Sequence, residues 1–280
     1  MIYVIGNKTF SVAVDSFGAQ LNSIKKDGQE KLWQNYDGSW KDHSPMLFPF
    51  CGHCAVKLGD KTYPAPAHGF AQNCEFKFIS QTETELVLNL SSDAATKKMY
   101  PFDFSFTVYY SVKKTTLFIK YVVKNTGDGV TYFGCGGHES FNIDGKLEDY
   151  GIEFEKEENL LRFYDGKNGL LLKKSSYYPN VKTLKFKDIP VEKDKTLVFK
   201  GIKSGWCRLV KNTGEVIAES HFEGFPNLLF WRPDGAAMIC IEPWINLPDK
   251  NGETTDFREK EGIYALSAGE ERVIERKIVY

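Results

Sequence analysis

The chain has 280 residues, of which 42% are hydrophobic and 26% are charged, and its formal net charge is −1. No basic stripe could follow a phosphate backbone, and no stretch approaches the roughly 20 apolar residues of a membrane helix, so neither nucleic acid nor a membrane is an expected partner. The N-terminus begins with strand-like residues instead of a charged segment followed by an apolar run, so no signal peptide is predicted and the cytoplasm is the expected location.

Segments with alternating apolar residues recur along the chain and predict β-strands. In chain order the clearest are residues 10–14, 86–90, 102–110 and 117–123. Turn signals that contain Gly near Asn or Asp separate such segments. These signals are Asp27-Gly28, 125–129, Asp165-Gly166, 212–214, 233–235 and Asn251-Gly252.

Helical patterns are scarce in this sequence. The best candidate is a turn or two within residues 92–100, which Pro101 would end. Strands that follow one another without helical crossovers form antiparallel sheets, and no change of composition, low-complexity tract or repeat marks a second domain. We therefore predict a single all-β domain over residues 1–280, built as a large antiparallel β-sandwich.

The six cysteines are too few for a disulfide scaffold. Cys51-Gly52-His53-Cys54 has the spacing of a zinc half-site, but no second pair matches it. The other cysteines stand alone in the sequence: Cys74, Cys135, Cys207 and Cys240. Buried or free thiols and no bound metal are therefore expected.

Polar residues inside apolar or Gly-rich runs are the candidates for chemistry, because burying a charged group is costly unless it has a partner or a use. His138 follows three glycines within four residues, which allow close approach of the backbone. Its side chain has an ordinary pKa of about 6.5, which suits proton transfer near neutral pH. Glu242 ends an apolar strand before Pro243 and Trp244, and burial would raise its pKa and make it a candidate base.

Each of these residues also has a structural interpretation, His138 as part of a kinked strand and Glu242 as a strand-end residue facing water. His68 lies in a Pro-rich loop beside an aromatic residue, and a loop histidine of this kind is more often idle than functional. His43 and His221 have no supporting context and are interpreted as structural.

Six ordered landmarks carry a resemblance that covers nearly the whole chain. They are GAQL at residues 18–21 with Trp33 downstream, PMLFPFCG at 45–52, HGF at 68–70, YPF at 100–102, GHESFN at 137–142 and CIEPW at 240–244. With these landmarks the sequence resembles the aldose 1-epimerases, a galactose mutarotase-like family, and in particular its LacX-like bacterial branch.

The resemblance implies a large antiparallel β-sandwich with a sugar cleft on one concave face, and neither a metal nor an organic cofactor. It also implies that His138 is the general acid, that Glu242 is the general base, and that His68 contacts sugar oxygens. The aromatic residues that are candidates to stack on the sugar are Trp231, Trp244 and Phe70.

Two positions depart from the pattern of the family, because His53 and Gln72 stand where relatives commonly carry arginine. An arginine offers several fixed hydrogen-bond donors to sugar hydroxyls, whereas histidine and glutamine offer fewer. The resemblance also implies a sugar-binding aspartate before a strand at residues 196–200. Asp194 is the nearest aspartate, although Lys195 could occupy the matching position.

The chain is therefore expected to be an isomerase, an aldose 1-epimerase that interconverts the α and β anomers of a free aldose by acid–base ring opening. One alternative is a carbohydrate-binding or sensing protein, which the missing arginines favour and the pair His138 and Glu242 disfavours. The other is a sugar-phosphate 1-epimerase, which would need a cationic pocket for its dianionic substrate. A monomer and a homodimer both remain open.

Overall fold

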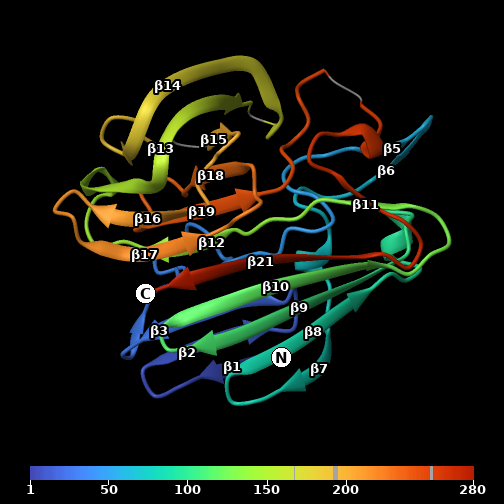
Figure 1. Ribbon diagram of the computed structural model, residues 1–280, viewed down its shortest axis with the longest axis horizontal. Helices are drawn as coiled ribbons and strands as arrows, with labels where there is room; N and C mark the ends of the chain where they lie inside the picture. Colours follow the sequence, from blue (N-terminus) through green and yellow to red (C-terminus); the bar gives the residue numbers. More distant parts are fainter. Residues whose placement is uncertain (167, 192–194, 253–254) are drawn as a thin grey trace.

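The computed structural model describes residues 1–166, 168–191, 195–252 and 255–280, and β-sheets packed in layers dominate it (Figure 1). One layer is a four-stranded antiparallel sheet whose strands are adjacent in chain order. Its strands are β1 (Ile2–Gly6), β2 (Phe10–Asp15), β3 (Gln20–Lys26) and β4 (Gln29–Glu30).

The other layer belongs to an antiparallel sheet of thirteen strands, as counted in the described residues. From one edge to the other its order is β12 (Glu139–Asn142), β19 (Met238–Trp244), β18 (Asn227–Trp231), β15 (Leu197–Lys200), β13 (Tyr150–Asp165), β16 (Trp206–Lys211), β17 (Val216–His221), β21 (Glu271–Val279), β10 (Thr116–Asn125), β9 (Phe104–Lys113), β8 (Glu85–Ser91) and β7 (Lys77–Gln81). The thirteenth strand, β14 (Leu171–Lys185), pairs with β13 outside this path.

The remaining elements are short. Two-stranded sheets join β5 (Val56–Leu58) to β6 (Lys61–Tyr63) and β11 (Thr131–Phe133) to β20 (Tyr264–Leu266). Helical structure in the described ranges consists of four 3-10 turns, η1 (Ala71–Asn73), η2 (Thr96–Lys98), η3 (Leu147–Asp149) and η4 (Phe257–Glu259). The prediction of an all-β fold is confirmed, and the helical turn expected before Pro101 is η2.

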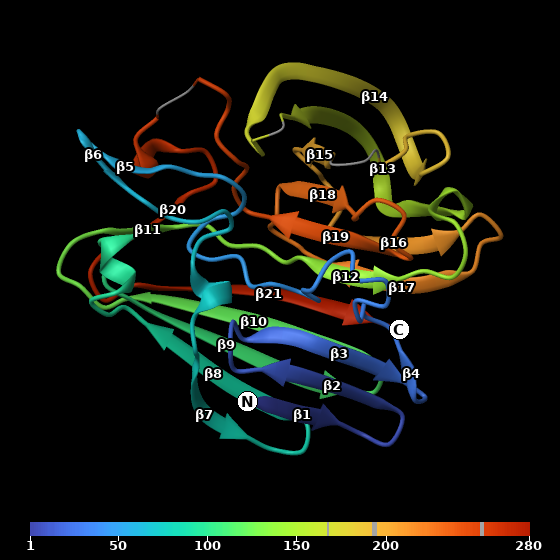
Figure 2. The ribbon, with the colours of Figure 1, turned by 180° about the vertical axis from the view of Figure 1, so that it is seen from behind.

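The two layers pack through the apolar side chains that alternate with polar ones along the strands. Along β9 the side chains of Phe104, Phe106, Val108 and Tyr110 are buried and their neighbours are partly exposed, as the sequence pattern of this segment predicts. The four-stranded sheet lies against β8 and β9 (Figure 2). Between the layers, the Tyr110 hydroxyl donates to the carbonyl oxygen of Ala19 at 2.7 Å. Truncating one of the buried Phe side chains to Ala would cost about 3–5 kcal/mol of stability.

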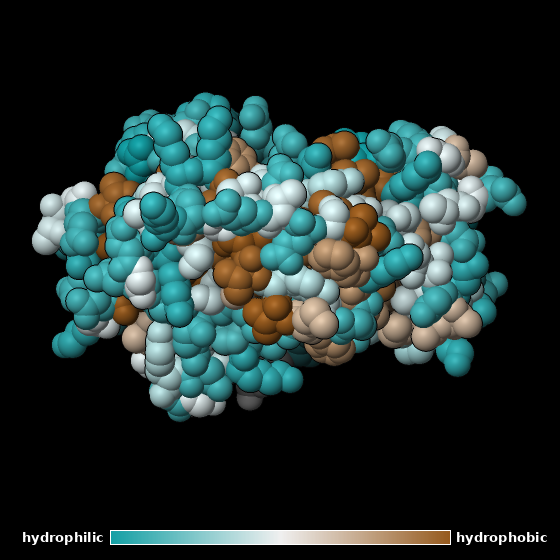
Figure 3. Space-filling view, turned by 90° about the horizontal axis from the view of Figure 1, so that it is seen from below, coloured by the Kyte–Doolittle hydropathy of each residue, from teal (hydrophilic) through white to brown (hydrophobic). Residues whose placement is uncertain are grey.

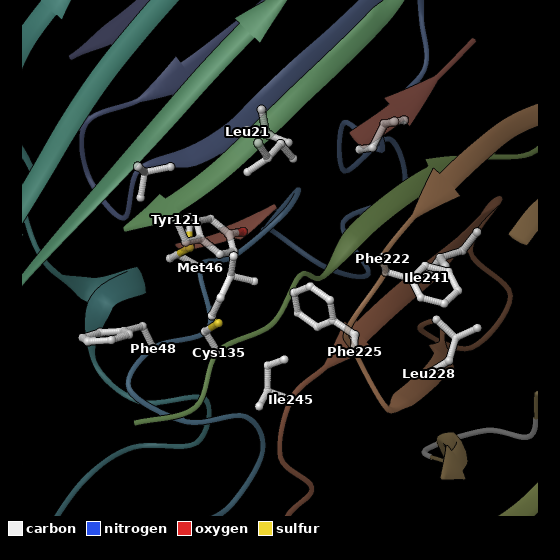
Figure 4. Close-up of a cluster of buried hydrophobic side chains, with 14 of the residues drawn as sticks. Leu21, Met46, Phe48, Tyr121, Cys135, Phe222, Phe225, Leu228, Ile241 and Ile245 are labelled. Carbon is white, nitrogen blue, oxygen red and sulfur yellow. The ribbon is translucent and has the colours of Figure 1, made fainter. Parts of the chain in front are cut away.

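The core continues without a break from the four-stranded sheet to the far half of the large sheet. Figure 4 shows Leu21 of β3 and Tyr121 of β10 at one side of the same cluster that contains Leu228 of β18 and Ile241 of β19. Phe225 lies between these two groups (Figure 4). Packing of this kind fixes the orientation of β18 and β19, and therefore of the residues on their opposite faces.

The opposite faces of β15, β18 and β19 form a floor that is separate from this main cluster, and its Val198 and Leu229 belong to a second, smaller buried cluster. Leu229 is the cross-strand partner of both Val198 and Glu242, so these three side chains form a row across the strands. Because side chains alternate along a strand, the neighbours Phe230 and Ile241 point into the core. The carboxylate of Glu242 is thereby held on a largely apolar floor.

No helix in the described ranges is long and apolar enough to cross a membrane. On the face shown in Figure 3, hydrophobic residues form small groups that hydrophilic side chains separate.

Candidate active site

A pocket of about 290 Å³ lies over the floor formed by Val198, Leu229 and Glu242. Three histidines, three carboxylates and three tryptophans line it, and no Lys or Arg among the described residues does so. The lining residues come from the floor strands, from the residue before β12, from the end of β13 and the start of β14, and from loops before β5, η1 and β15 and after β19. Segments far apart in the sequence therefore meet at one place.

His138 and Glu242 meet in this pocket. Glu139 of β12 is paired with Ile241 of β19, which brings the preceding histidine and the following glutamate side by side. His138 Nε2 lies 3.2 Å from Glu242 Oε2, and the two residues are only 7% and 1% exposed. His138 Nδ1 and Glu242 Oε1 have no hydrogen-bond partner within the described part of the chain. Since buried polar atoms are normally paired, these two atoms are suited to bind a polar ligand.

Burial shifts the pKa values of this pair in opposite directions. It lowers the pKa of His138 to about 4. It also raises the pKa of Glu242 well above the ordinary value, an effect to which the negative charge of Glu139 adds. Burial thus penalises an isolated charge on either group, while their contact stabilises the charges only as a pair. Both shifts therefore favour the state in which the pair has no net charge and holds one proton, on Glu242 or on His138.

The glycines before His138 are required by close packing. A Cβ atom on Gly136 would lie 2.8 Å from Cys51 Sγ, and one on Gly137 would lie 2.1 Å from Arg276 Nη1. The prediction that these glycines permit close approach of the backbone is confirmed.

Arg276 of β21 and Glu139 form a buried ion pair directly behind His138. Arg276 Nη1 donates to Glu139 Oε2 at 2.8 Å, and Nη2 donates to Glu139 Oε1 and to the Tyr121 hydroxyl, each at 2.7 Å. The Ser44 hydroxyl donates to the same carboxylate at 3.3 Å. These bonds compensate for the removal of both charges from water and fix the backbone beside His138. Sequence analysis missed this pair, because no local signal connects residue 139 with residue 276.

His68 enters the pocket from the loop before η1 in a left-handed backbone conformation, with φ of 65°. Its Nδ1 accepts a hydrogen bond from the Gly52 N–H at 3.1 Å, so the proton of the neutral ring is on Nε2. Burial, with His138 and His53 nearby, lowers the pKa of His68 well below its ordinary value. The ring lies edge-on to His138 and Trp244, with centroid distances of 5.5 and 5.3 Å. It is therefore placed to act as a neutral hydrogen-bond donor.

Tryptophan rings form an aromatic wall beside His138. Trp40 stacks on the His138 ring at 5.3 Å with an interplanar angle of 30°, and it packs edge-on against Trp231 at 5.2 Å. Trp231 and Trp244 line the pocket, where sequence analysis expected them. Trp40 was missed, although a lone tryptophan in the polar segment 34–45 is a signal for an aromatic contact to a ligand.

His53 and Gln72 also line the pocket. His53 is exposed, and a Cβ atom on Gly169 would lie 2.3 Å from its Cδ2 atom. The Gln72 side-chain amide donates to the carbonyl oxygen of Ala67 at 3.0 Å. Neither residue supplies the fixed positive charge that an arginine would bring to this side of the pocket.

The structure corrects the expectation for Phe70. Its ring is 1% exposed and packs against Phe48, Tyr100 and Phe104, with centroid distances of 6.0–6.4 Å. Phe70 anchors the loop that contains His68 to the aromatic core. It does not line the pocket, because its ring is part of that core.

Asp194, the nearest candidate for the sugar-binding aspartate that the resemblance implies, lies outside the described residues, so its role stays a prediction. Asp165, at the end of β13, lines the pocket, and both of its carboxylate oxygens lie 3.3 Å from the Thr196 backbone nitrogen, which donates to them. Sequence analysis interpreted Asp165 only as part of a turn, because the pairing of β13 with β15 was not apparent from the sequence.

Comparisons with known proteins identify the family of this chain. The family model of aldose 1-epimerases matches residues 1–255. The structure of a galactose mutarotase related enzyme from Lactobacillus acidophilus is 26% identical and matches 100% of this chain and 97% of that one, with a TM-score of 0.92. A galactose mutarotase-like protein from Lactobacillus casei gives the same identity and TM-score and matches 100% of this chain and 99% of that one.

A relative in Escherichia coli, named as a candidate glucose-6-phosphate 1-epimerase, is 31% identical over 109 residues. The match spans 35% of this chain and 35% of that relative. The family match, in contrast, extends over most of the chain, and the structural likeness extends over all of it. The chain therefore belongs to the aldose 1-epimerase family, a family of isomerases that act on carbohydrates.

Proposed function

We propose that this protein is a mutarotase that interconverts the α and β anomers of a free aldose, with Glu242 as the general base and His138 as the general acid. The observation that carries the proposal is the 3.2 Å contact between these two buried groups, each of which has a further polar atom without a partner in the described residues. Two groups that differ in proton affinity and share one site are what ring opening of an aldose requires.

In the proposed mechanism the proton of the pair is on His138 when the sugar is bound. Glu242 takes the proton of the anomeric hydroxyl while His138 donates a proton to the ring oxygen, so the C1–O5 bond breaks and C1 becomes a carbonyl carbon. Rotation about C1–C2 then exposes the other face of the carbonyl, and the reverse proton transfers close the ring. Each turnover returns both protons, so no cofactor has to be regenerated.

The other pocket residues would position the sugar. His68 would donate its Nε2 proton to a sugar oxygen, and Asp165 would accept from a hydroxyl. The rings of Trp231 and Trp244 would cover the apolar faces of the sugar. Acid–base catalysis typically contributes about 10²- to 10⁴-fold to a rate, and positioning of the sugar adds to it.

The Escherichia coli relative makes a sugar phosphate the alternative substrate. Asp42, Asp165 and Glu242 line the pocket, and among the described lining residues there is no Lys or Arg to offset a phosphate dianion. Lys195, just outside the lining, donates to the carbonyl oxygen of Asp165 at 3.2 Å. Repulsion by the carboxylates therefore favours an uncharged aldose over a phosphorylated one.

The test is anomer exchange, followed by polarimetry or NMR, on freshly dissolved α-D-glucose, α-D-galactose and α-D-glucose 6-phosphate. We expect at least one free aldose to be converted with kcat/KM about tenfold or more above that of the phosphate. A preference for the phosphate would replace the free-aldose proposal by the sugar-phosphate one. A change of tryptophan fluorescence with sugar but no exchange above the uncatalysed rate would identify a binding protein.

A further inference from the structure

Cys240 lies beside the proposed acid–base pair and has no part in the proposed mechanism. It is two residues before Glu242 on β19, so both side chains are on the same face of that strand, and its cross-strand partner is Trp231. The sulfur of Cys240, one ring nitrogen of His138 and one carboxylate oxygen of Glu242 all lie within 4.8 Å of one another. All three residues are buried.

We propose that His138, Cys240 and Glu242 form a binding site for a thiophilic divalent cation such as Zn²⁺, and that the bound ion inhibits the enzyme. The inhibition rests on the proposed function, because the ion would occupy both members of the acid–base pair. The binding of the ion does not rest on it.

The geometry of the three groups suits zinc. Thiolate, imidazole and carboxylate are its usual ligands in proteins, with bonds of about 2.3 Å to sulfur and about 2.0–2.2 Å to nitrogen and oxygen. Two nitrogen or oxygen ligands of a tetrahedral zinc ion are therefore about 3.3 Å apart, and His138 Nε2 and Glu242 Oε2 are 3.2 Å apart. A movement of the Cys240 side chain by about 1 Å completes the three-ligand set, and His138 and Glu242 connect the site to the pocket that they line.

The charge balance of the site favours a doubly charged ion. Binding releases the thiol proton of Cys240 and the one proton that His138 and Glu242 share, so the ion meets one thiolate, one carboxylate and one neutral imidazole. The ion and its three ligands then have no net charge together, which is the least costly state for a buried site. Because Mg²⁺ and Ca²⁺ prefer sets of oxygen ligands, they are not expected to bind here.

Titration of the metal-free protein with Co²⁺ tests the binding without an activity assay. Co²⁺ substitutes for zinc, and a bond from cobalt to a thiolate gives a near-ultraviolet charge-transfer band. We expect this band in the wild type, its loss when one equivalent of Zn²⁺ is added, and its absence in Cys240→Ser. Cys240→Ala is the second variant if the serine variant does not fold. Cys207→Ser removes a buried thiol on β16 and should keep the band.

Two results would overturn the site. One is the absence of a thiolate band in the wild type. The other is a band that persists in the Cys240 variants and disappears in Cys51→Ser or Cys54→Ser, which would assign the metal to the Cys51-Gly52-His53-Cys54 segment.

Anomer exchange in the presence of Zn²⁺ tests the inhibition. Relative to its own rate without Zn²⁺, Cys240→Ser should have a half-inhibiting Zn²⁺ concentration at least about tenfold higher than that of the wild type, the scale on which changed metal contacts act. Equal sensitivity of the two proteins would refute the inhibition. A Cys240-dependent cobalt band in a protein without anomer exchange would establish the metal site while the proposed function failed.

Discussion

At the scale of single residues, the site depends on two buried groups that touch each other, His138 and Glu242. The contact between His138 and Glu242 keeps one proton in the pair, because burial opposes a lone charge on either group. A bound aldose would insert between them, with its anomeric hydroxyl toward Glu242 and its ring oxygen toward His138. The hydroxyl groups of the sugar would then solvate the charged form of the pair.

Substitution of either member of the pair should remove most of the catalysis. Glu242→Gln keeps the shape of the side chain but cannot take up a proton, and His138→Asn keeps a polar group but cannot donate one to the ring oxygen. We expect each variant to lower the rate of anomer exchange by about 10²-fold or more. The double variant should be little worse than either single one, because both groups act in one step.

Sugar binding, followed by tryptophan fluorescence, serves as the control for these variants and should change far less than the rate. His68→Ala should behave in the opposite way, with weaker binding and a smaller effect on turnover at saturation, because His68 donates to the sugar without exchanging protons with it. Near-normal exchange in a folded Glu242→Gln variant would exclude Glu242 as the base.

At the scale of the elements, the position of His138 depends on how the start of β12 packs against β21. The pair of Glu139 and Arg276 joins the two strands, and Gly137 lies so close to the guanidinium group that a Cβ atom would overlap it. The guanidinium cannot move away without losing its bonds to Glu139 and to Tyr121.

Gly137→Ala should therefore destabilise the protein and lower its activity. Displacing Arg276 exposes the charge of Glu139 to an apolar environment, and removing one partner of a buried ion pair costs about 3–5 kcal/mol. We expect a loss of the order of 3 kcal/mol in the free energy of unfolding, together with a reduced rate of anomer exchange from the displaced His138. Chemical denaturation and polarimetry measure the two effects.

Gly129→Ala is the matched control, because a Cβ atom at Gly129 would meet nothing within 4 Å. It should change the stability by no more than about 0.5 kcal/mol. If Gly137→Ala were as mild as this control, the close packing of Arg276 would not hold the start of β12 in place.

The elements differ in how far the sequence predicts them. Strands such as β9 and β10 can be predicted because their apolar and polar residues alternate locally in the chain, and the glycines before His138 predict a close contact of the backbone. The identity of that contact does not follow, because Arg276 is 139 residues away from Gly137 in the sequence. Asp165 was missed for the same reason, since this end of β13 reaches the pocket through the pairing of β13 with the distant strand β15. Trp40 was missed although its segment carries a local signal, because the sequence does not show that its ring meets His138.

At the scale of the whole molecule, the buried titratable groups of the pocket couple stability to pH. Neutral His68 in the folded protein must gain a proton on unfolding below about pH 6.5, its ordinary pKa. Its lowered folded pKa therefore contributes stability that is present above about pH 6.5 and is lost as the pH falls.

The pair of His138 and Glu242 acts differently because it holds one proton in the folded state. Between about pH 4.5 and 6.5 the unfolded chain also carries one proton on these two residues. In that range the pair therefore does not make the free energy of unfolding depend on pH. Above about pH 6.5 the unfolded chain carries none, and the raised pKa of Glu242 makes stability fall as the pH rises.

We therefore expect the free energy of unfolding to be highest near about pH 6.5 and to fall on both sides, with each group contributing at most about 1.4 kcal/mol per pH unit. His68→Gln should flatten the acid side between about pH 4.5 and 6.5. Glu242→Gln should flatten the alkaline side and steepen the acid side, because His138, whose pKa is lowered to about 4, then has to gain its own proton on unfolding. Urea denaturation at a series of pH values measures all three curves. An alkaline side that is unchanged in Glu242→Gln would show that the folded pair does not retain a proton above neutral pH.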